Sequence, residues 1–140
     1  MGSDEPVRVL GEAECWDRVA AAPYGRLAMS VSDQVDIVPV NVVLSGGDLY
    51  FRTAPGSKLA EIAANPRVAF EVDGYDDDTA FSVVVKGVAE RLERHADIDA
   101  AEELPLTPWI PTPKYRWVRI RPESVTGRAF RRGPEPERYV

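Results

Sequence analysis

The chain is poor in the residues that most often build catalytic or metal sites. It has one cysteine, Cys15, one histidine, His95, and 3 lysines against 14 arginines in 140 residues. A single cysteine cannot form an internal disulfide, and its neighbours have no metal-ligand spacing. One histidine in the polar stretch "ERLERHAD" gives no basis for a Ser-His-Asp or Cys-His catalytic group. The acids at 76–78 lack the spacing of a calcium loop, so we expect no metal.

Long apolar runs and a positive net charge are missing too. No run approaches the roughly 20 apolar residues of a membrane span. The N-terminal "MGSDEPVRVL" lacks the basic and then apolar pattern of a signal peptide. A formal net charge of −6 offers no broad basic face to nucleic acid. We therefore expect a soluble cytoplasmic protein that binds neither nucleic acid nor membrane.

The remaining composition is that of one globular domain. Hydrophobic residues make up 44% and charged residues 29% of the chain, and 140 residues can bury a core without disulfides. Apolar, β-branched segments between turn residues predict strands, and 3.6-residue periodicity predicts short helices. The expected strands are 25–31, 35–44, 49–53, 67–73, 80–93, 115–122 and 123–130, and the expected helices are 11–22, 57–65 and 96–104. This order predicts a mainly β fold, an antiparallel barrel with flanking helices.

The stretch "LYFRTAPGSKLAEI", residues 49–62, has the character of an anion cradle. Arg52 at a strand end can direct two N–H groups at one oxyanion. Ser57 can cap the following helix, whose first-turn N–H groups then point to the same place. Lys58 adds a positive charge, so the group suits a phosphate monoester.

Two known phosphate loops are excluded for this stretch. The order Gly56-Ser57-Lys58 does not match the P-loop pattern, and no G-x-G-x-x-G exists for a Rossmann turn. The alternative interpretation is structural: Ser57 only caps the helix, and Arg52 and Lys58 are solvated.

A second feature is the pair Pro39 and Asn41 inside the apolar strand "VDIVPVNVVL". Proline cannot donate to a sheet ladder, so it marks an edge, a bulge or a ligand contact. Asn41 places an amide among valines, where it needs a hydrogen-bond partner. Either the strand is kinked with Asn41 toward solvent, or its backbone and amide meet the polar rim of a flat heteroaromatic ring. The "SGGD" hairpin turn would bring Asn41 beside Arg52.

The ordered segments "GRLAMSV", "VDIVPVNVVLSGGDLYFRTAPGSKLAEIAANPRVAFEVD", "FSVVVKGVAERL" and "WVRIRPESVTGR" together resemble a known family. Over roughly residues 8–130 the chain resembles the pyridoxamine 5′-phosphate oxidase-like, FMN-binding split-barrel family, in particular its small actinobacterial members. The resemblance implies a single six-stranded split β-barrel domain over 1–140, with loosely ordered tails at 1–7 and 131–140. It also implies a homodimer with two FMN sites at the subunit interface.

The resemblance also assigns site residues. The strand segment Pro39, Val40, Asn41 and Val42 would line the isoalloxazine ring. The phosphate would be held by Arg52, Thr53, Ser57, Lys58 and Leu59, and Trp117 would reach the flavin from the partner subunit. This chain departs from the oxidases proper: an arginine at the start of the "VNVVL" strand, the "S-R-K" turn and the C-terminal Arg-x-His element are absent. These departures argue against pyridoxamine phosphate as the substrate.

The functional hypothesis is an FMN-dependent oxidoreductase acting on an unidentified small molecule. No catalytic acid or base is assigned. Three alternatives stay open: a deazaflavin-dependent reductase on the same fold, a non-catalytic flavin-binding or sensing protein, and a reductase of nitro compounds. The net charge of −6 argues against the long acidic tail of a deazaflavin.

Overall fold

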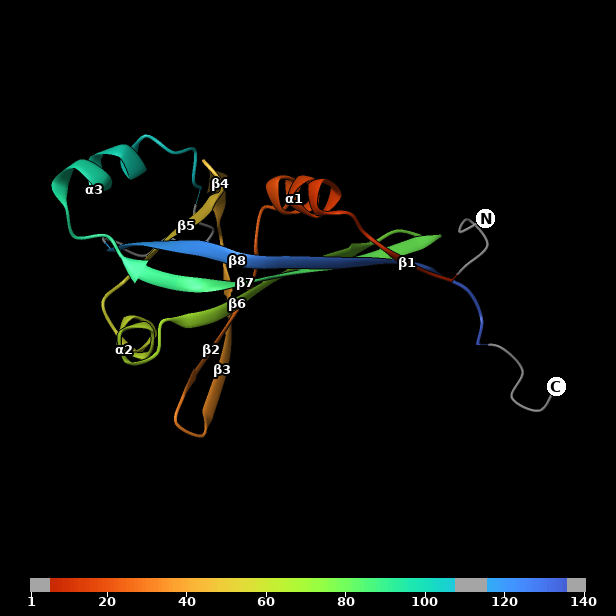
Figure 1. Ribbon diagram of the computed structural model, residues 1–140, viewed down its shortest axis with the longest axis horizontal. Helices are drawn as coiled ribbons and strands as arrows, with labels where there is room; N and C mark the ends of the chain where they lie inside the picture. The colour runs from red at the N-terminus through yellow and green to blue at the C-terminus, as the bar shows by residue number, and fades with distance from the viewer. Residues whose placement is uncertain (1–5, 108–115, 136–140) are drawn as a thin grey trace.

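The computed structural model of the chain describes residues 6–107 and 116–135. Within these ranges it has eight strands and three helices (Figure 1). The strands are β1 (Val7–Val9), β2 (Gly25–Val31), β3 (Gln34–Val40), β4 (Val43–Ser45), β5 (Asp48–Thr53), β6 (Arg67–Tyr75), β7 (Thr79–Arg91) and β8 (Arg116–Arg131), and the helices are α1 (Glu12–Ala21), α2 (Ser57–Ala64) and α3 (His95–Glu102). The expectation of a mainly β antiparallel fold with flanking helices is confirmed, with eight strands in place of six.

All strand pairings are antiparallel, and they follow the order β3-β2-β6-β7-β8-β5-β4, with β1 paired to β8. The two ends of this order, β3 and β4, are joined by only Asn41 and Val42. The sheet must therefore curl until its ends meet. Because no ladder joins β3 to β4 among the described residues, the barrel stays split at this seam.

Two predicted local features are confirmed. Pro39 lies on β3, at an end of the sheet, where its missing N–H removes no ladder bond to a further strand. Gly46 and Gly47 connect β4 to β5 with φ of +59° and +84°. Positive φ at both central residues is the requirement of a tight hairpin turn, which glycine meets without steric cost.

Three expectations about strands need correction. The segment 35–44 is broken at Asn41 and Val42 into β3 and β4. The two closing strands are one long strand, β8, because the register shift between Lys86 and Gly87 lets the ladder pass Pro122. A Cβ on Gly87 would overlap the carbonyl oxygen of Arg121, so this close approach requires glycine. β1 was not anticipated.

The expected tails, residues 1–7 and 131–140, are each one residue too long. Val7 pairs with Phe130 at one end of β1, and β8 continues to Arg131, whose N–H donates to the carbonyl of Pro6 at 2.8 Å. The two segments predicted as tails therefore each contribute a residue to the sheet.

One main core fills the barrel. Its fully buried members come from β2, β5, β6, β7 and β8, and α1 adds Cys15 and Val19. Ile62 closes the barrel on the side of α2. A smaller cluster of Leu92, Ala101 and Trp117 lies under α3. α3 therefore packs on the sheet through contacts that are separate from the main core.

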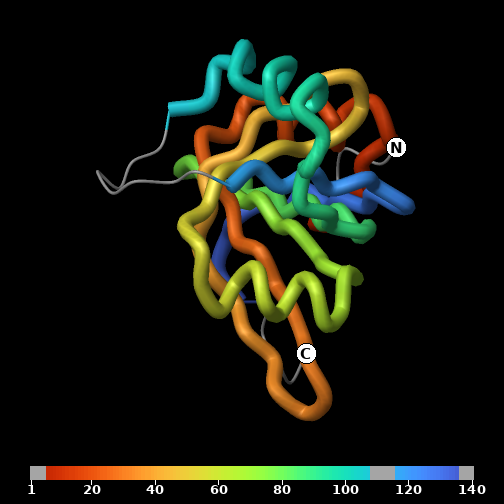
Figure 2. Tube along the Cα trace, turned by 90° about the vertical axis from the view of Figure 1, so that its left-hand side faces the viewer, coloured from red at the N-terminus to blue at the C-terminus, as the bar shows by residue number. Residues whose placement is uncertain are grey.

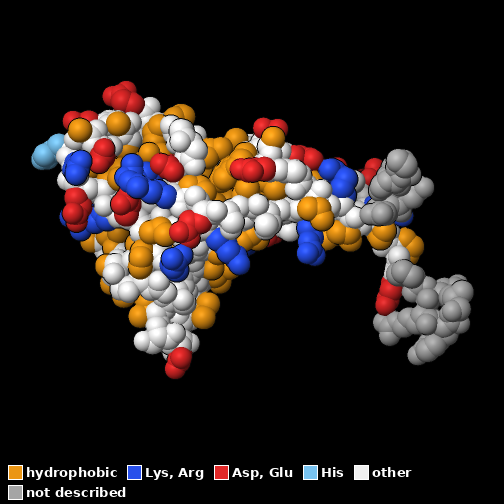
Figure 3. Space-filling view, viewed as in Figure 1, with side chains coloured by type: hydrophobic (Ala, Val, Ile, Leu, Met, Phe, Trp, Pro, Cys, Tyr) orange, Lys and Arg blue, Asp and Glu red, His pale blue; other side chains and the backbone are white. Residues whose placement is uncertain are grey.

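The strands β6, β7 and β8 run beyond the barrel as a long arm, and the β2–β3 hairpin projects away from it (Figure 1). Seen from the side, α2 crosses in front of this hairpin (Figure 2). The surface is hollowed between the hairpin and the arm (Figure 3). On β3, Val35 and Ile37 are 75% and 64% exposed, so this hairpin presents an apolar edge to its surroundings.

Candidate functional site

The residues of the predicted phosphate cradle lie where β5 ends and α2 begins. Alternation along β5 directs Phe51 and Thr53 into the barrel, with 0% and 4% exposed, and leaves Arg52 on the outer face. The turn 54–56 then leads directly into Ser57 and Lys58, the first two residues of α2. Leu59 packs against the main core and anchors the helix start.

Ser57 does not cap α2, contrary to the expectation from sequence. The N-cap position is Gly56, and no side chain among the described residues caps the helix there. The first N–H groups of a helix have no acceptor within the helix. Because no side chain occupies them and the first turn carries no acid, the start of α2 is a more open anion-binding position than a Ser57 cap would have left.

Arg52 has an incomplete set of hydrogen bonds. Its Nε is buried and has no partner among the described residues. Its guanidinium lies over the ring of Trp117, 5.4 Å from the ring centroid, because the two residues are register partners on β5 and β8. A buried, unpaired donor is costly, so this nitrogen is suited to an acceptor that arrives with a ligand.

Trp117 is held within its own chain. It is 3% exposed beneath α3, and its Nε1–H donates to Oε1 of Glu102 at 2.9 Å. In this structure its contact is with Arg52 rather than with the surface. Contact with a flavin bound by a partner subunit would require α3 to move.

Lys58 lies on the other side of β5 from Arg52. Its Nζ is 5.9 Å from the centroid of Phe51, a core residue. Arg116 on β8, the register partner of Thr53, adds a third cation at this end of the sheet. Sequence reasoning missed Arg116, although the alternation in "YRWVRIRP" could have placed it beside the cradle once β5 and β8 were paired.

The segment predicted to line the flavin ring, residues 39–42, has side chains on both faces of the sheet. Val40 and Val42 point into the core with 6% and 8% exposed, so only their backbone can line a ligand. Pro39 is exposed on the outer face. The Nδ2 of Asn41 donates to the carbonyl oxygen of Pro23 at 3.1 Å, which gives the amide a partner in its own chain.

A charged group adjoins this segment. Arg26, the register partner of Pro39, donates to Glu71 at 2.8 Å and to Asp73 at 3.1 Å. Burial and the neighbouring Asp73 raise the pKa of Glu71, while Arg26 opposes the rise. The outer face beside Pro39 therefore offers a carboxyl group that holds a proton more readily than an exposed one.

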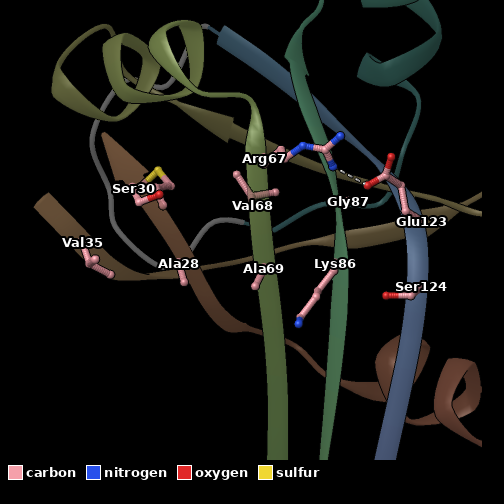
Figure 4. Close-up of a pocket in the computed structure, with 11 residues that line it drawn as sticks. Ala28, Ser30, Val35, Arg67, Val68, Ala69, Lys86, Gly87, Glu123 and Ser124 are labelled. Atoms are coloured by element: carbon pink, nitrogen blue, oxygen red, sulfur yellow. Dashed lines mark hydrogen bonds and ion pairs between the residues drawn. The ribbon is translucent and has the colours of Figure 1, made fainter. Parts of the chain in front are cut away.

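An open hollow of about 500 Å³ lies on the same outer face (Figure 4). Its volume is within the range of small-molecule sites, roughly 300–1,000 Å³. Arg67 and Glu123 form an ion pair of 2.8 Å at its rim. The lining residues are Ala28, Met29, Ser30, Val35, Arg67, Val68, Ala69, Lys86, Gly87, Glu123 and Ser124. This hollow could not be predicted from the sequence, because its residues come from five strands that only the fold brings together.

Other chemistry is sparse in the described ranges. No group of three His, Cys, Asp or Glu side chains is placed there to hold a metal ion. Cys15 is buried, and burial raises the pKa of its thiol, which disfavours the reactive thiolate. None of the described helices has the length and apolar character that a membrane crossing requires.

Comparison with known proteins identifies the family. A family model described as pyridoxamine 5′-phosphate oxidase matches residues 11–129. The chain belongs to the pyridoxamine 5′-phosphate oxidase family. A Corynebacterium glutamicum structure that bears the same family description is 44% identical, with a TM-score of 0.86 over 94% of this chain and 98% of that one.

Two further relatives are similar over most of the domain. The structure of an FAD-binding protein from Mycobacterium smegmatis is 38% identical, with a TM-score of 0.75 over 88% of this chain and 98% of that one. An uncharacterized Mycobacterium tuberculosis protein is 43% identical over 69% of this chain and 87% of its own length. The resemblance drawn from sequence, to the split-barrel family and its actinobacterial members, is therefore confirmed.

Proposed function

We propose that this chain is a flavin-dependent oxidoreductase that binds FMN as a homodimer in the cytoplasm. In this proposal the phosphate occupies the cradle at the start of α2, and the isoalloxazine ring lies along Pro39, Val40, Asn41 and Val42. The substrate is a small molecule other than pyridoxamine phosphate.

The observation that carries the proposal is the state of the cradle. Within the described part of the chain, the buried Nε of Arg52 has no partner, and the uncapped start of α2 follows the end of the same strand. Lys58 and Arg116 add positive charge in a chain whose net charge is −6. A phosphate is the kind of ligand that helix N–H groups and a lysine stabilise together, and Arg52 would reach it from the opposite side of β5.

Each residue has a defined part when the cofactor is bound. Lys58, the hydroxyl groups of Thr53 and Ser57, and the first N–H groups of α2 hold the phosphate. Arg52 contacts the ligand from the outer face of the sheet. Its guanidinium is held in place by stacking on the ring of Trp117. Asn41 exchanges its bond to Pro23 for one to the polar edge of the ring. The flavin supplies the two-electron chemistry, and the protein supplies binding, orientation and electrostatics.

FAD is the second candidate cofactor. The Mycobacterium smegmatis protein, which is 38% identical, is an FAD-binding protein. FAD contains the same flavin, ribityl chain and first phosphate as FMN. The cradle would then hold that first phosphate, and the adenosine half would extend beyond the start of α2.

Dimer formation is supported by the apolar edge of β3. Val35 and Ile37 are exposed on a hairpin that projects from the barrel. Large exposed apolar side chains gathered on one face commonly mark an interaction surface. Light scattering after gel filtration should give about twice the mass of the 15.5 kDa chain. A monomer would remove this part of the proposal.

The cofactor is tested by absorbance and titration. The purified protein should show a flavin band, or should take up FMN or FAD when titrated. Reduction by dithionite and reoxidation by a panel of acceptors then test catalysis. Preference for a deazaflavin would keep the fold and change the enzyme class, and tight flavin binding without turnover would favour a storage or sensing role. Binding of none of the three would refute the proposal.

A further inference from the structure

The hollow on the outer face of the sheet has an ordered chemical layout. Register places one residue from each of five strands in a row: Ile37, Ala28, Ala69, Lys86 and Ser124. All five side chains lie on the same face, because register partners in a sheet share a face. The row therefore runs from an apolar end on β3, across two alanines, to a lysine and a hydroxyl group.

The two alanines account for the hollow. Ala28 and Ala69 lie between larger neighbours, and Val35 forms the wall on the hairpin side (Figure 4). Larger side chains at these positions would fill the space. The floor is thus apolar, and it extends over about three strand spacings of 4.8 Å from β3 to β7, or roughly 14 Å.

Lys86 is the uncompensated charge of this site. It makes no hydrogen bond or ion pair with any residue that the structure describes. The nearest acid along the rim, Glu123, is bound by Arg67 at 2.8 Å. The next acids on the outer face, Glu71 and Asp73, are bound by Arg26. Each of these acids on β6 and β8 therefore already forms an ion pair with an arginine.

From this layout we infer that the hollow binds a small organic acid, with its carboxylate on Lys86 and Ser124 and its flat apolar body over Ala69 and Ala28. The lysine provides charge and the serine a hydroxyl donor for the carboxylate. The alanine floor and Val35 provide the apolar contact. The inference does not depend on a bound flavin. If the proposed function holds, such an acid is the substrate.

The test is titration of the protein as purified with sodium benzoate, followed by ¹⁵N–¹H NMR. Benzamide, a neutral molecule of the same shape, is the matched probe. We expect benzoate to shift the amide signals of Ala69, Lys86, Gly87 and Ser124, and benzamide to shift them at least about threefold less at equal concentration.

Three variants sharpen the test. Lys86→Gln should weaken benzoate binding at least about threefold. Arg128→Gln, which removes another exposed cation of β8, should leave it unchanged. Arg67→Gln frees Glu123 to pair with Lys86 and should weaken binding as well. The spectrum of each variant also reports whether it is folded.

Four results would overturn the inference: equal shifts with both probes, unchanged binding in Lys86→Gln, shifts confined to the start of α2, or hollow signals that respond only to protein dilution. The last would mean that a second copy of the chain occupies the hollow. FMN titration of Lys86→Gln separates the two proposals, since loss of benzoate binding with FMN binding intact concerns the hollow alone.

Discussion

Replacing Lys58 with methionine should weaken FMN binding by about 1–3 kcal/mol, or roughly 5- to 150-fold in Kd. Riboflavin, which lacks the phosphate, should bind the variant as it binds the parent protein. Methionine keeps the apolar stem and removes only the ammonium charge, which lies 5.9 Å from the centroid of the Phe51 ring. The first turn of α2 holds no acid, so the substitution leaves no carboxylate of that turn without a cation.

The magnitude is set by what remains at the cradle. In the proposed complex, Arg116 and the N–H groups of α2 would still hold the phosphate of the variant, and Arg52 would still contact the ligand from the other side of β5, which keeps the loss to one contact. Quenching of flavin fluorescence measures both affinities, and the difference between FMN and riboflavin isolates the phosphate contribution. Arg52→Met should show the same selectivity for FMN, because it removes a buried Nε that has no partner among the described residues.

Arg128→Met is the control, since Arg128 is an exposed cation on β8 away from the cradle. Equal losses for FMN and riboflavin in the Lys58 variant would show that the mutation perturbs the ring site or the fold. Unchanged FMN affinity in both the Lys58 and Arg52 variants would refute the assignment of the phosphate to this cradle.

Three further predictions concern the fold. Gly87→Ala should lower the free energy of unfolding by about 1–3 kcal/mol in urea titrations, because its Cβ overlaps the carbonyl of Arg121, while Gly133→Ala, which meets nothing within 4 Å, should be neutral. Hydrogen bonds from the N–H groups of Thr79 and Asp78 lower the pKa of Asp76. The ionised Asp76 carboxylate therefore stabilises the fold above the ordinary aspartate pKa of about 4, and this stabilisation is lost as pH falls toward the lowered pKa. Asp76→Asn should therefore flatten the acid-side decline in stability below pH 5, and an unchanged pH profile would contradict this linkage. Cys15 should react with a thiol reagent only when the protein unfolds, and rapid labelling of the native protein would show that its burial is wrong.

The fold was predictable where local chemistry decides it. Gly46 and Gly47 specify a tight turn through their own backbone freedom, and Pro39 restricts its strand to an edge. β1 escaped detection because three residues carry little periodic signal, and Val7 and Val9 are exposed. The continuity of β8 past Pro122 depends on a bulge opposite Gly87, a partner far away in the sequence.

The residues of the candidate site could be named from the sequence, but their arrangement could not. Arg52, Ser57 and Lys58 could be read from a strand, a turn and a helix start. The N-cap of α2 is Gly56 and not Ser57. Sequence alone does not separate the two, since the end of a helix can shift by one or two residues with the local backbone geometry. Alternation along β5 already separates Arg52 from Thr53 by face, whereas the stacking of Arg52 on Trp117 follows only from the pairing of β5 with β8.

The face of β3 places a constraint on any substrate. Val35, Ile37 and Pro39 alternate onto one side of the strand, so the hollow and the proposed ring segment share a surface. The four residue steps of extended chain from Val35 to Pro39 span about 13 Å. A reacting atom must come within roughly 3–3.5 Å of the flavin ring. An acid held by Lys86 must therefore be elongated, with its reactive end far from the carboxylate, or must meet a ring that a second copy of the chain brings to this face.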